Sequence, residues 1–123
     1  MAIHFRPAPG QVLGCDFENA IKPEMQGWHL VVVVSTGSNK FGKSCDVVPI
    51  THIENWPVPA WHLPLPQGSY PFISQDSWAK ADLATRVGFR GLDVLASDVG
   101  GRGAKITRGD LGKLHDCIRA LAG

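Results

Sequence analysis

The 123-residue sequence has no long hydrophobic run and almost no net charge. Its four consecutive valines at positions 31–34 are far too few to cross a bilayer, and the first ten residues lack the apolar run of a secretory signal. We therefore expect a cytoplasmic protein with no membrane partner. A net charge of +1 is low for a protein that holds duplex DNA through many phosphate contacts, but it allows a local groove for a short single strand.

Cysteine is also scarce. Cys15, Cys45 and Cys117 are widely separated, and no Cys-x-x-Cys pair or cysteine–histidine cluster suggests zinc. Each cysteine stands among apolar residues, so we expect buried free thiols, which fit a reducing compartment. The sequence therefore predicts neither a metal site nor a cofactor.

The composition, with 44% hydrophobic and 19% charged residues, is typical of one globular domain spanning residues 1–123. Short apolar runs bounded by glycine and proline predict strands rather than helices over most of the chain. The expected strands are residues 11–17, 30–35, 44–50 (stopped by Pro49), 60–65 (an edge strand, because of Pro64) and 77–83. Residues 89–95 fit either a short strand or a helical turn, and Gly14 suggests a bulge or a close backbone approach.

One helix stands out at the end of the chain. Leu111, Leu114, Ile118 and Leu121 recur at three- and four-residue steps, which predicts a helix over residues 108–121. Thr107 or Asp110 can cap its start. Many short strands with one terminal helix predict a mainly β (α+β) fold, for which we prefer an SH3-like small antiparallel barrel with a C-terminal helix over a sandwich.

The stretch from residue 27 to residue 51 is the most informative. Two apolar runs of strand length flank a polar loop, with His29 entering the first run and Thr51 ending the second. If the runs pair as neighbouring strands, His29 and Thr51 fall at the same end of the sheet. A proton-transfer group and a hydroxyl donor would then meet where a phosphodiester could sit.

Four segments carry a resemblance that extends over most of the chain. They are PAPGQVLGCDF (7–17), IKPEMQGWHLVVVVS (21–35), DVVPIT (46–51) and SWAKADL (77–83). In order and spacing they resemble the MazF/PemK toxins of type II toxin–antitoxin systems. The resemblance implies a homodimer and a cognate antitoxin. It also implies a metal-independent endoribonuclease that cleaves single-stranded RNA, with the RNA 2′-hydroxyl as nucleophile.

The resemblance also implies roles for three residues. Glu24 matches a family glutamate that helps to activate the 2′-hydroxyl, and Thr51 matches the active-site threonine that hydrogen-bonds the phosphate. The family's Arg-Pro pair is here His29–Leu30, so His29 would stabilise charge on the phosphate and protonate the leaving oxygen. The alternatives are a solvated loop carboxylate for Glu24, a space-filling histidine, and a threonine that bonds its own backbone.

Further residues fit substrate binding. Lys80 and Asp82 share one face of the expected strand 77–83, where they would contact RNA or form a solvated ion pair. Lys43 lies in a loop that could touch RNA or be an ordinary charged turn. Trp56, Trp61 and Trp78 could stack on bases, although tryptophans of so small a domain usually belong to a core or a dimer interface.

Two hypotheses of different classes remain open. The first is the toxin-like endoribonuclease. The second is a catalytically degenerate MazF-like protein that binds RNA, an antitoxin or another protein, because the arginine is lost. A serine hydrolase is disfavoured, since the sequence has no Gly-x-Ser-x-Gly elbow.

Overall fold

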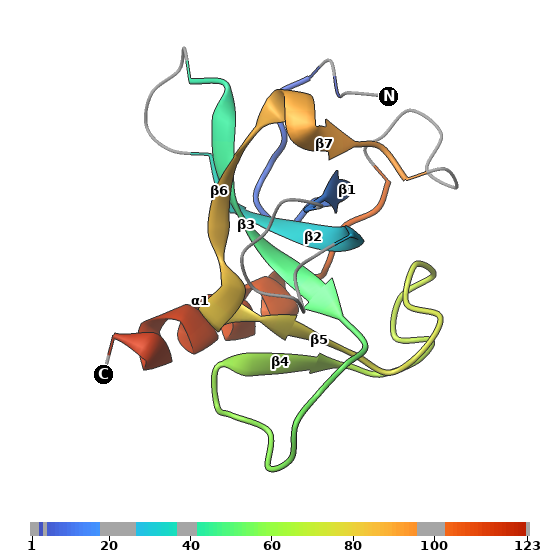
Figure 1. Ribbon diagram of the computed structural model, residues 1–123, viewed down its shortest axis with the longest axis vertical. Helices are drawn as coiled ribbons and strands as arrows, with labels where there is room; N and C mark the ends of the chain where they lie inside the picture. Colours follow the sequence, from blue (N-terminus) through green and yellow to red (C-terminus); the bar gives the residue numbers. More distant parts are fainter. Residues whose placement is uncertain (1–2, 4, 18–26, 37–41, 96–102, 123) are drawn as a thin grey trace.

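The computed structural model describes residues 3, 5–17, 27–36, 42–95 and 103–122 (Figure 1). Glu24 lies outside the described residues. Within them the chain forms seven strands, two short 3₁₀ helices and one α-helix. Their bounds are β1 Val12–Asp16, β2 Trp28–Ser35, β3 Ser44–Thr51, β4 His62–Leu65, β5 Ser77–Lys80, η2 Ala81–Leu83, β6 Thr85–Gly88, η3 Phe89–Gly91, β7 Leu92–Asp93 and α1 Arg108–Leu121.

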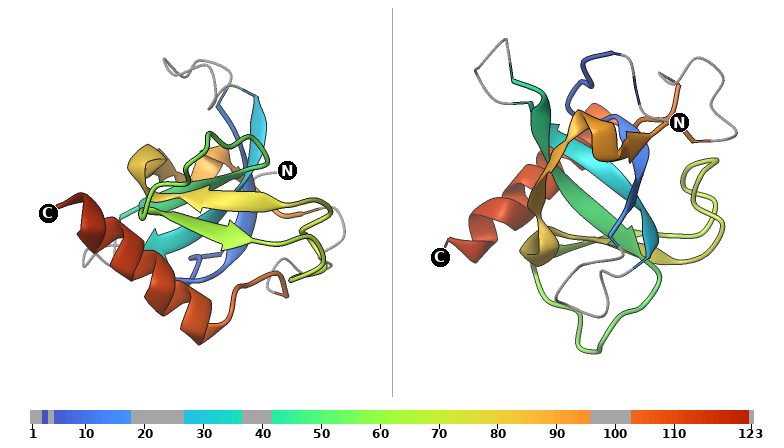
Figure 2. Two further views of the ribbon diagram at one scale, coloured as in Figure 1. Left: turned by 90° about the horizontal axis from the view of Figure 1, so that it is seen from below. Right: turned by 45° about the horizontal axis from the view of Figure 1, so that its top comes forward.

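Strand β3 organises the sheet. The antiparallel order is β4-β5-β3-β2-β1-β7, and β6 adds a second partner to β3. On one side β3 pairs with β2, and on the other it pairs first with β6 and then, at its end, with β5. Helix α1 lies alongside β4 and η2 (Figure 2). The predicted mainly β fold, an SH3-like antiparallel barrel with a C-terminal helix, is confirmed.

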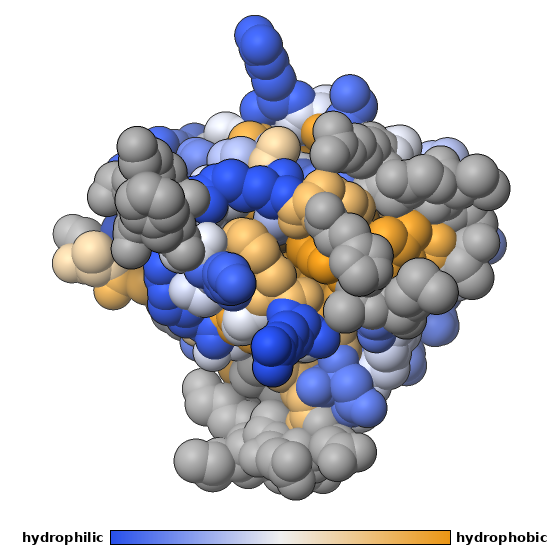
Figure 3. Space-filling view, turned by 90° about the horizontal axis from the view of Figure 1, so that it is seen from above, coloured by the Kyte–Doolittle hydropathy of each residue, from blue (hydrophilic) through white to orange (hydrophobic). Residues whose placement is uncertain are grey.

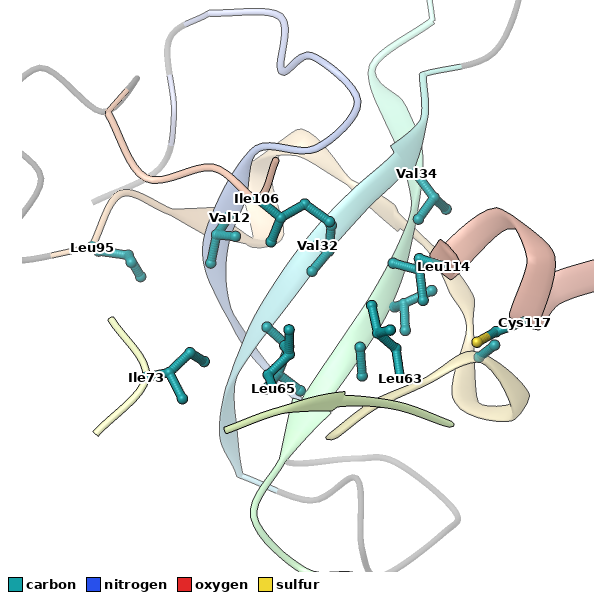
Figure 4. Close-up of a cluster of buried hydrophobic side chains, with 14 residues drawn as sticks. Val12, Val32, Val34, Leu63, Leu65, Ile73, Leu95, Ile106, Leu114 and Cys117 are labelled. Atoms are coloured by element: carbon teal, nitrogen blue, oxygen red, sulfur yellow. The ribbon is translucent and has the colours of Figure 1, made fainter. Parts of the chain in front are cut away.

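Two hydrophobic clusters hold the sheet, one on each of its faces. Alternate residues of β2 supply both: Val32 and Val34 face the cluster beneath α1 (Figure 4), while Val31 and Val33 face the other. A continuous apolar run is therefore required, because this strand is buried on both faces. Each fully buried valine or leucine side chain contributes about 1.5–3 kcal/mol.

The predicted helix is confirmed at both ends. Thr107 is its N-cap, and the Thr107 hydroxyl accepts a hydrogen bond from the backbone N–H of Asp110 at 3.1 Å. Leu114 and Cys117 are buried in the first cluster, while Leu111 and Ile118 pack against its margin. Leu121 is exposed, so the apolar face of α1 does not contact the core at the C-terminal end of the helix.

Gly14 is a close-approach position, as one of the two interpretations predicted. A Cβ atom at residue 14 would lie 2.2 Å from Cζ2 of Trp28, because the indole of Trp28 crosses directly over the β1 backbone. Any side chain here would push the ring away. β4 is likewise confirmed as an edge strand, with Pro64 exposed on it.

Two strand predictions were wrong. Pro49 does not stop β3, which continues to Thr51. Pro49 falls between the part of β3 that pairs with β6 and the part that pairs with β5, so a missing N–H disturbs neither ladder. The expected strand 77–83 ends at Lys80, and residues 81–83 turn as η2.

Around residues 85–95 the sequence was less informative. β6 was not predicted, because Thr85–Gly88 contains one large apolar residue and gains its place only by pairing with distant β3. For residues 89–95 the sequence allowed either a helical turn or a short strand. The structure contains both, because η3 is followed directly by β7.

All three cysteines are buried free thiols, as predicted. Burial, with nearby aspartates, raises the pKa of Cys15 and of Cys45 from 9.0 to about 11.

We expect the three thiols of the native protein to react slowly with a disulfide reagent at pH 8, and all three to react rapidly in urea. The pKa values of Cys15 and Cys45 are higher in the folded protein than in the unfolded chain, so the folded state favours the protonated thiols. The stability that these two thiols contribute is therefore complete below pH 9 and is lost as the pH rises through about 11. Fast labelling of the native protein at pH 8 would contradict this burial.

Candidate active site at the end of strand β3

The sheet register brings His29 and Thr51 together. Leu30 of β2 pairs with Ile50 of β3, so His29 and Thr51 are the next two residues in the same register. Thr51 in turn pairs with Trp78 of β5. Side chains that share such a row point to the same face of the sheet. The register therefore confirms that His29 and Thr51 fall at the same end of the sheet.

His29 sits at the entrance to β2, where its side chain is half-buried. It pairs with Cys15 of β1, and its ring centroid lies 6.0 Å from that of Phe17, with the planes tilted by 50°. The His29 ring therefore packs against Phe17, on the β1 side of β2.

Thr51 is almost completely buried, with 4% of its surface exposed. Its hydroxyl donates a hydrogen bond to the backbone carbonyl of Ile53 at 3.1 Å. This is the alternative in which a strand-end threonine bonds its own backbone. A hydroxyl has only one proton to donate, so Thr51 must rotate away from Ile53 before it can donate to a phosphate.

A charged cluster of Glu54, His62, Lys80 and Asp82 lies beside this row. His62 Nδ1 is 2.7 Å from Glu54 Oε2, and His62 Nε2 is 2.8 Å from Asp82 Oδ1. Lys80 Nζ is 3.8 Å from Glu54 Oε1. Because each ring nitrogen meets a carboxylate, the doubly protonated imidazolium satisfies both contacts, whereas a neutral ring has a single N–H.

Burial makes this cluster unusual. The side chains of Glu54, His62 and Lys80 are 2%, 6% and 3% exposed. Buried charges persist only when they are paired and hydrogen-bonded. The cluster therefore ties residues 52–61 to β4, β5 and η2, directly after Thr51.

Sequence reasoning missed Glu54 and His62, and it misplaced two of their partners. Lys80 and Asp82 do not share one face of a strand, because β5 ends at Lys80 and Asp82 lies in η2. Lys80 points into the cluster towards Glu54, and Asp82 contacts His62. The sequence signal for His62 was weak, because this residue is a single histidine next to the core residue Leu63 in a strand of four residues.

Lys43 does not belong to the same location. It is exposed and immediately precedes β3, whereas Thr51 ends that strand. At 3.3 Å per residue, the two Cα atoms are separated by about 26 Å along the strand. Within one chain, Lys43 and Thr51 cannot contact the same phosphate.

The tryptophans divide between surface and core. Trp56 is 76% exposed and meets Trp78 edge-on, with ring centroids 6.3 Å apart. Together with Val58, Pro64 and Pro66 they line an apolar pocket of about 340 Å³, here called the tryptophan pocket. Trp61, by contrast, packs against the first core cluster.

The family model for the "PemK-like, MazF-like toxin of type II toxin-antitoxin system" matches residues 8–121. The chain belongs to the PemK/MazF toxin family. No curated protein sequence matches it. The similar solved structures include MazF from Deinococcus radiodurans, with 16% identity, TM-score 0.69, and coverage of 97% of this chain and 98% of that one.

Two further structures are toxin–antitoxin complexes. One is MazE-MazF from Deinococcus radiodurans, with 15% identity, TM-score 0.63 and coverage of 97% of each chain. The other is an endoribonuclease with its cognate antitoxin from a mycobacterial species, with 18% identity, TM-score 0.63, and coverage of 96% of this chain and 94% of that one. At these identities the likeness shows a shared MazF fold.

The described part of this PemK/MazF-family chain offers little to a metal ion. Among residues 5–17, 27–36, 42–95 and 103–122, no group of three histidine, cysteine, aspartate or glutamate side chains is arranged to hold one. In the same part of the chain, no helix is long and apolar enough to cross a membrane.

Proposed function

We propose that this protein is a toxin-like endoribonuclease that cleaves single-stranded mRNA by attack of the RNA 2′-hydroxyl, without a metal ion. Family membership supports the activity class. The observation that carries the site is the register that aligns His29 with Thr51 at one end of β2 and β3. Because the substrate supplies its own nucleophile, the protein needs only a base, an acid and donors to the phosphate.

Each step has a candidate group. Glu24 accepts the proton of the 2′-hydroxyl as general base. His29, as imidazolium, offsets charge on the phosphate and then protonates the 5′ leaving oxygen. Thr51 donates its hydroxyl to a non-bridging phosphate oxygen. An oriented base or acid accelerates such a reaction by about 10²–10⁴-fold.

Thr51 has to change partners for this chemistry. A phosphate oxygen carries more negative charge than the Ile53 carbonyl, so it is the stronger acceptor. Rotation about one bond of the Thr51 side chain turns the hydroxyl from the Ile53 carbonyl to the phosphate oxygen. This rotation requires that residues 52–61 leave space for the phosphate. We propose that Lys80 and Asp82, through Glu54 and His62, hold these residues in place next to the bound RNA.

The same face fits the expected protein partners. We propose that a cognate antitoxin covers the tryptophan pocket and the neighbouring end of β3, which would block the entry of RNA. We also propose a homodimer, to which the exposed Trp28, Ile53 and Leu121 would contribute apolar area. An mRNA substrate and buried free thiols favour a cytoplasmic protein.

The second candidate is a catalytically degenerate binding protein on the same fold. Two observations favour it: the Thr51 hydroxyl already donates to Ile53, and Lys80 is held by Glu54 beneath the surface. Such a protein would bind RNA or an antitoxin but leave RNA intact.

One assay decides between the two candidates. The purified chain is incubated with mixed-sequence single-stranded RNA in EDTA between pH 5 and pH 8, and new ends are mapped. Cleavage that leaves 2′,3′-cyclic phosphates supports the enzyme. Intact RNA at every pH, with RNA bound, supports the binding protein.

His29 gives this assay a sharper form. We expect His29→Ala to reduce the cleavage rate about 10²–10⁴-fold, as for loss of a general acid. His52→Ala is the matched control, because His52 is an exposed histidine directly after Thr51. His29→Arg, which keeps a positive charge at this position, should retain more activity than His29→Ala. Equal rates for His29→Ala and His52→Ala would remove His29 from the mechanism.

A further inference from the structure

A second pocket lies at the opposite end of β3 from Thr51. Phe5, Arg6, Lys43, Phe89 and Arg90 line a space of about 540 Å³. This volume is within the range of about 300–1,000 Å³ typical of small-ligand sites. Figure 3 shows this end of the molecule, where hydrophilic residues lie beside a hydrophobic patch. We call it the basic pocket.

The lining of the basic pocket is cationic. It contains three side chains that stay positively charged at neutral pH and no acidic side chain. Lys43 and Arg90 are exposed, and no ion-pair partner for either is found among the described residues. Such a pocket attracts anions.

Local contacts preorganise this lining. Arg6 donates to the backbone carbonyls of Gly42 and Thr36 at 3.3 and 3.1 Å, which fixes its guanidinium over the start of β3. The backbone N–H of Phe89 donates to the Lys43 carbonyl at 2.8 Å, which joins η3 to the same corner. The cations therefore come from three separate segments that are held together.

Two aromatic rings complete the pocket. Phe5 and Phe89 pack against the second core cluster but remain partly exposed. Phosphate-binding cations beside half-exposed rings are the combination with which proteins hold single-stranded nucleic acids, because a base stacks on the ring while its phosphate meets the cation.

We propose that the basic pocket is a distal subsite that holds a nucleotide of the single-stranded RNA away from the cleaved bond. The inference rests on the proposed function for its ligand. The pocket and Thr51 stand about 26 Å apart along β3, and the single-strand sites of OB-fold barrels span about 4–16 nucleotides. An RNA strand that reaches both ends of β3 would thus gain affinity at one end and undergo cleavage at the other.

The test measures binding separately from cleavage. The probe is a fluorescein-labelled, mixed-sequence 2′-O-methyl RNA of 16 nucleotides, which lacks the nucleophile, titrated with the full chain at several salt concentrations. Lys43→Ala/Arg90→Ala is compared with Lys113→Ala/Arg108→Ala, which removes the same charges from exposed positions of α1. Phe89→Leu tests stacking while keeping apolar volume.

We expect Lys43→Ala/Arg90→Ala to bind roughly tenfold more weakly at low salt and to lower the slope of log K against log salt by about 1.4, the value for two lost single-strand phosphate contacts. Phe89→Leu should weaken binding about fivefold or more. The α1 variant should bind as the parent does. Equal affinities for the two double variants would overturn the proposal, as would a change of oligomeric state confined to Lys43→Ala/Arg90→Ala, which would make the pocket an interface between copies.

The same experiment distinguishes the two proposals. If unmodified RNA stays intact while the basic-pocket variants still weaken binding, the catalytic function fails and the subsite stands. If RNA is cleaved and no basic-pocket variant alters binding, the subsite fails and the catalytic function stands.

Discussion

His62→Ala is expected to lower the free energy of unfolding by about 3–5 kcal/mol, because it removes the imidazole that bridges two carboxylates. Glu54 is 2% exposed and would lose its 2.7 Å contact to the imidazole, keeping on Oε1 the Asn55 backbone N–H at 2.9 Å and the Lys80 ammonium at 3.8 Å. Asp82 would lose its buried partner as well. Urea unfolding followed by tryptophan fluorescence measures the loss, with Trp56 in the segment that follows Glu54 and Trp78 in β5.

The control is an exposed ion pair of the same chain. Arg86 and Asp46 lie 3.0 Å apart, but their side chains are 52% and 41% exposed. Asp46→Ala should therefore cost at most about 1 kcal/mol. A similar small cost for His62→Ala would show that the charged cluster is solvated in solution.

A double-mutant cycle keeps this prediction testable if His62→Ala does not fold. Glu54→Gln and His62→Gln each leave the other member of the pair with a poorer partner, whereas Glu54→Gln/His62→Gln replaces both members of the 2.7 Å contact. We expect the double variant to lose less stability than the two single variants together, as residues in direct contact are coupled. Additive losses would contradict a direct interaction.

Thr51→Ala is expected to reduce RNA cleavage about 10²–10³-fold, the effect of removing one donor from a developing oxyanion. The hydroxyl also holds the Ile53 carbonyl, so stability should fall by only about 0.5–1.5 kcal/mol. Initial rates on a defined RNA, measured well below the unfolding temperature of each variant, separate the two effects.

Thr51→Ser is the matched control, because it keeps the hydroxyl and removes one methyl group. It should retain most of the activity, and binding of 2′-O-methyl RNA should be the same for both variants. Equal cleavage by Thr51→Ala and the parent would mean that the hydroxyl stays on Ile53 and has no role in the reaction.

The sequence was sufficient for the features that depend on near neighbours. Helix α1 and its Thr107 cap follow from three- and four-residue periodicity and one side chain. The buried thiols follow from apolar surroundings, and the alignment of His29 with Thr51 follows from two runs that pair across one loop. Each of these is specified within one or two adjacent elements.

Tertiary structure alone determined what surrounds Thr51. Glu54, His62 and Asp82 come from separate segments, and only the curvature that carries β4 and β5 around β3 brings their charges within hydrogen-bonding distance. The same pairing buried Lys80 beside Glu54. Periodicity tells which face of a strand a side chain occupies, but the partner it meets there depends on non-local register, which a single sequence does not specify.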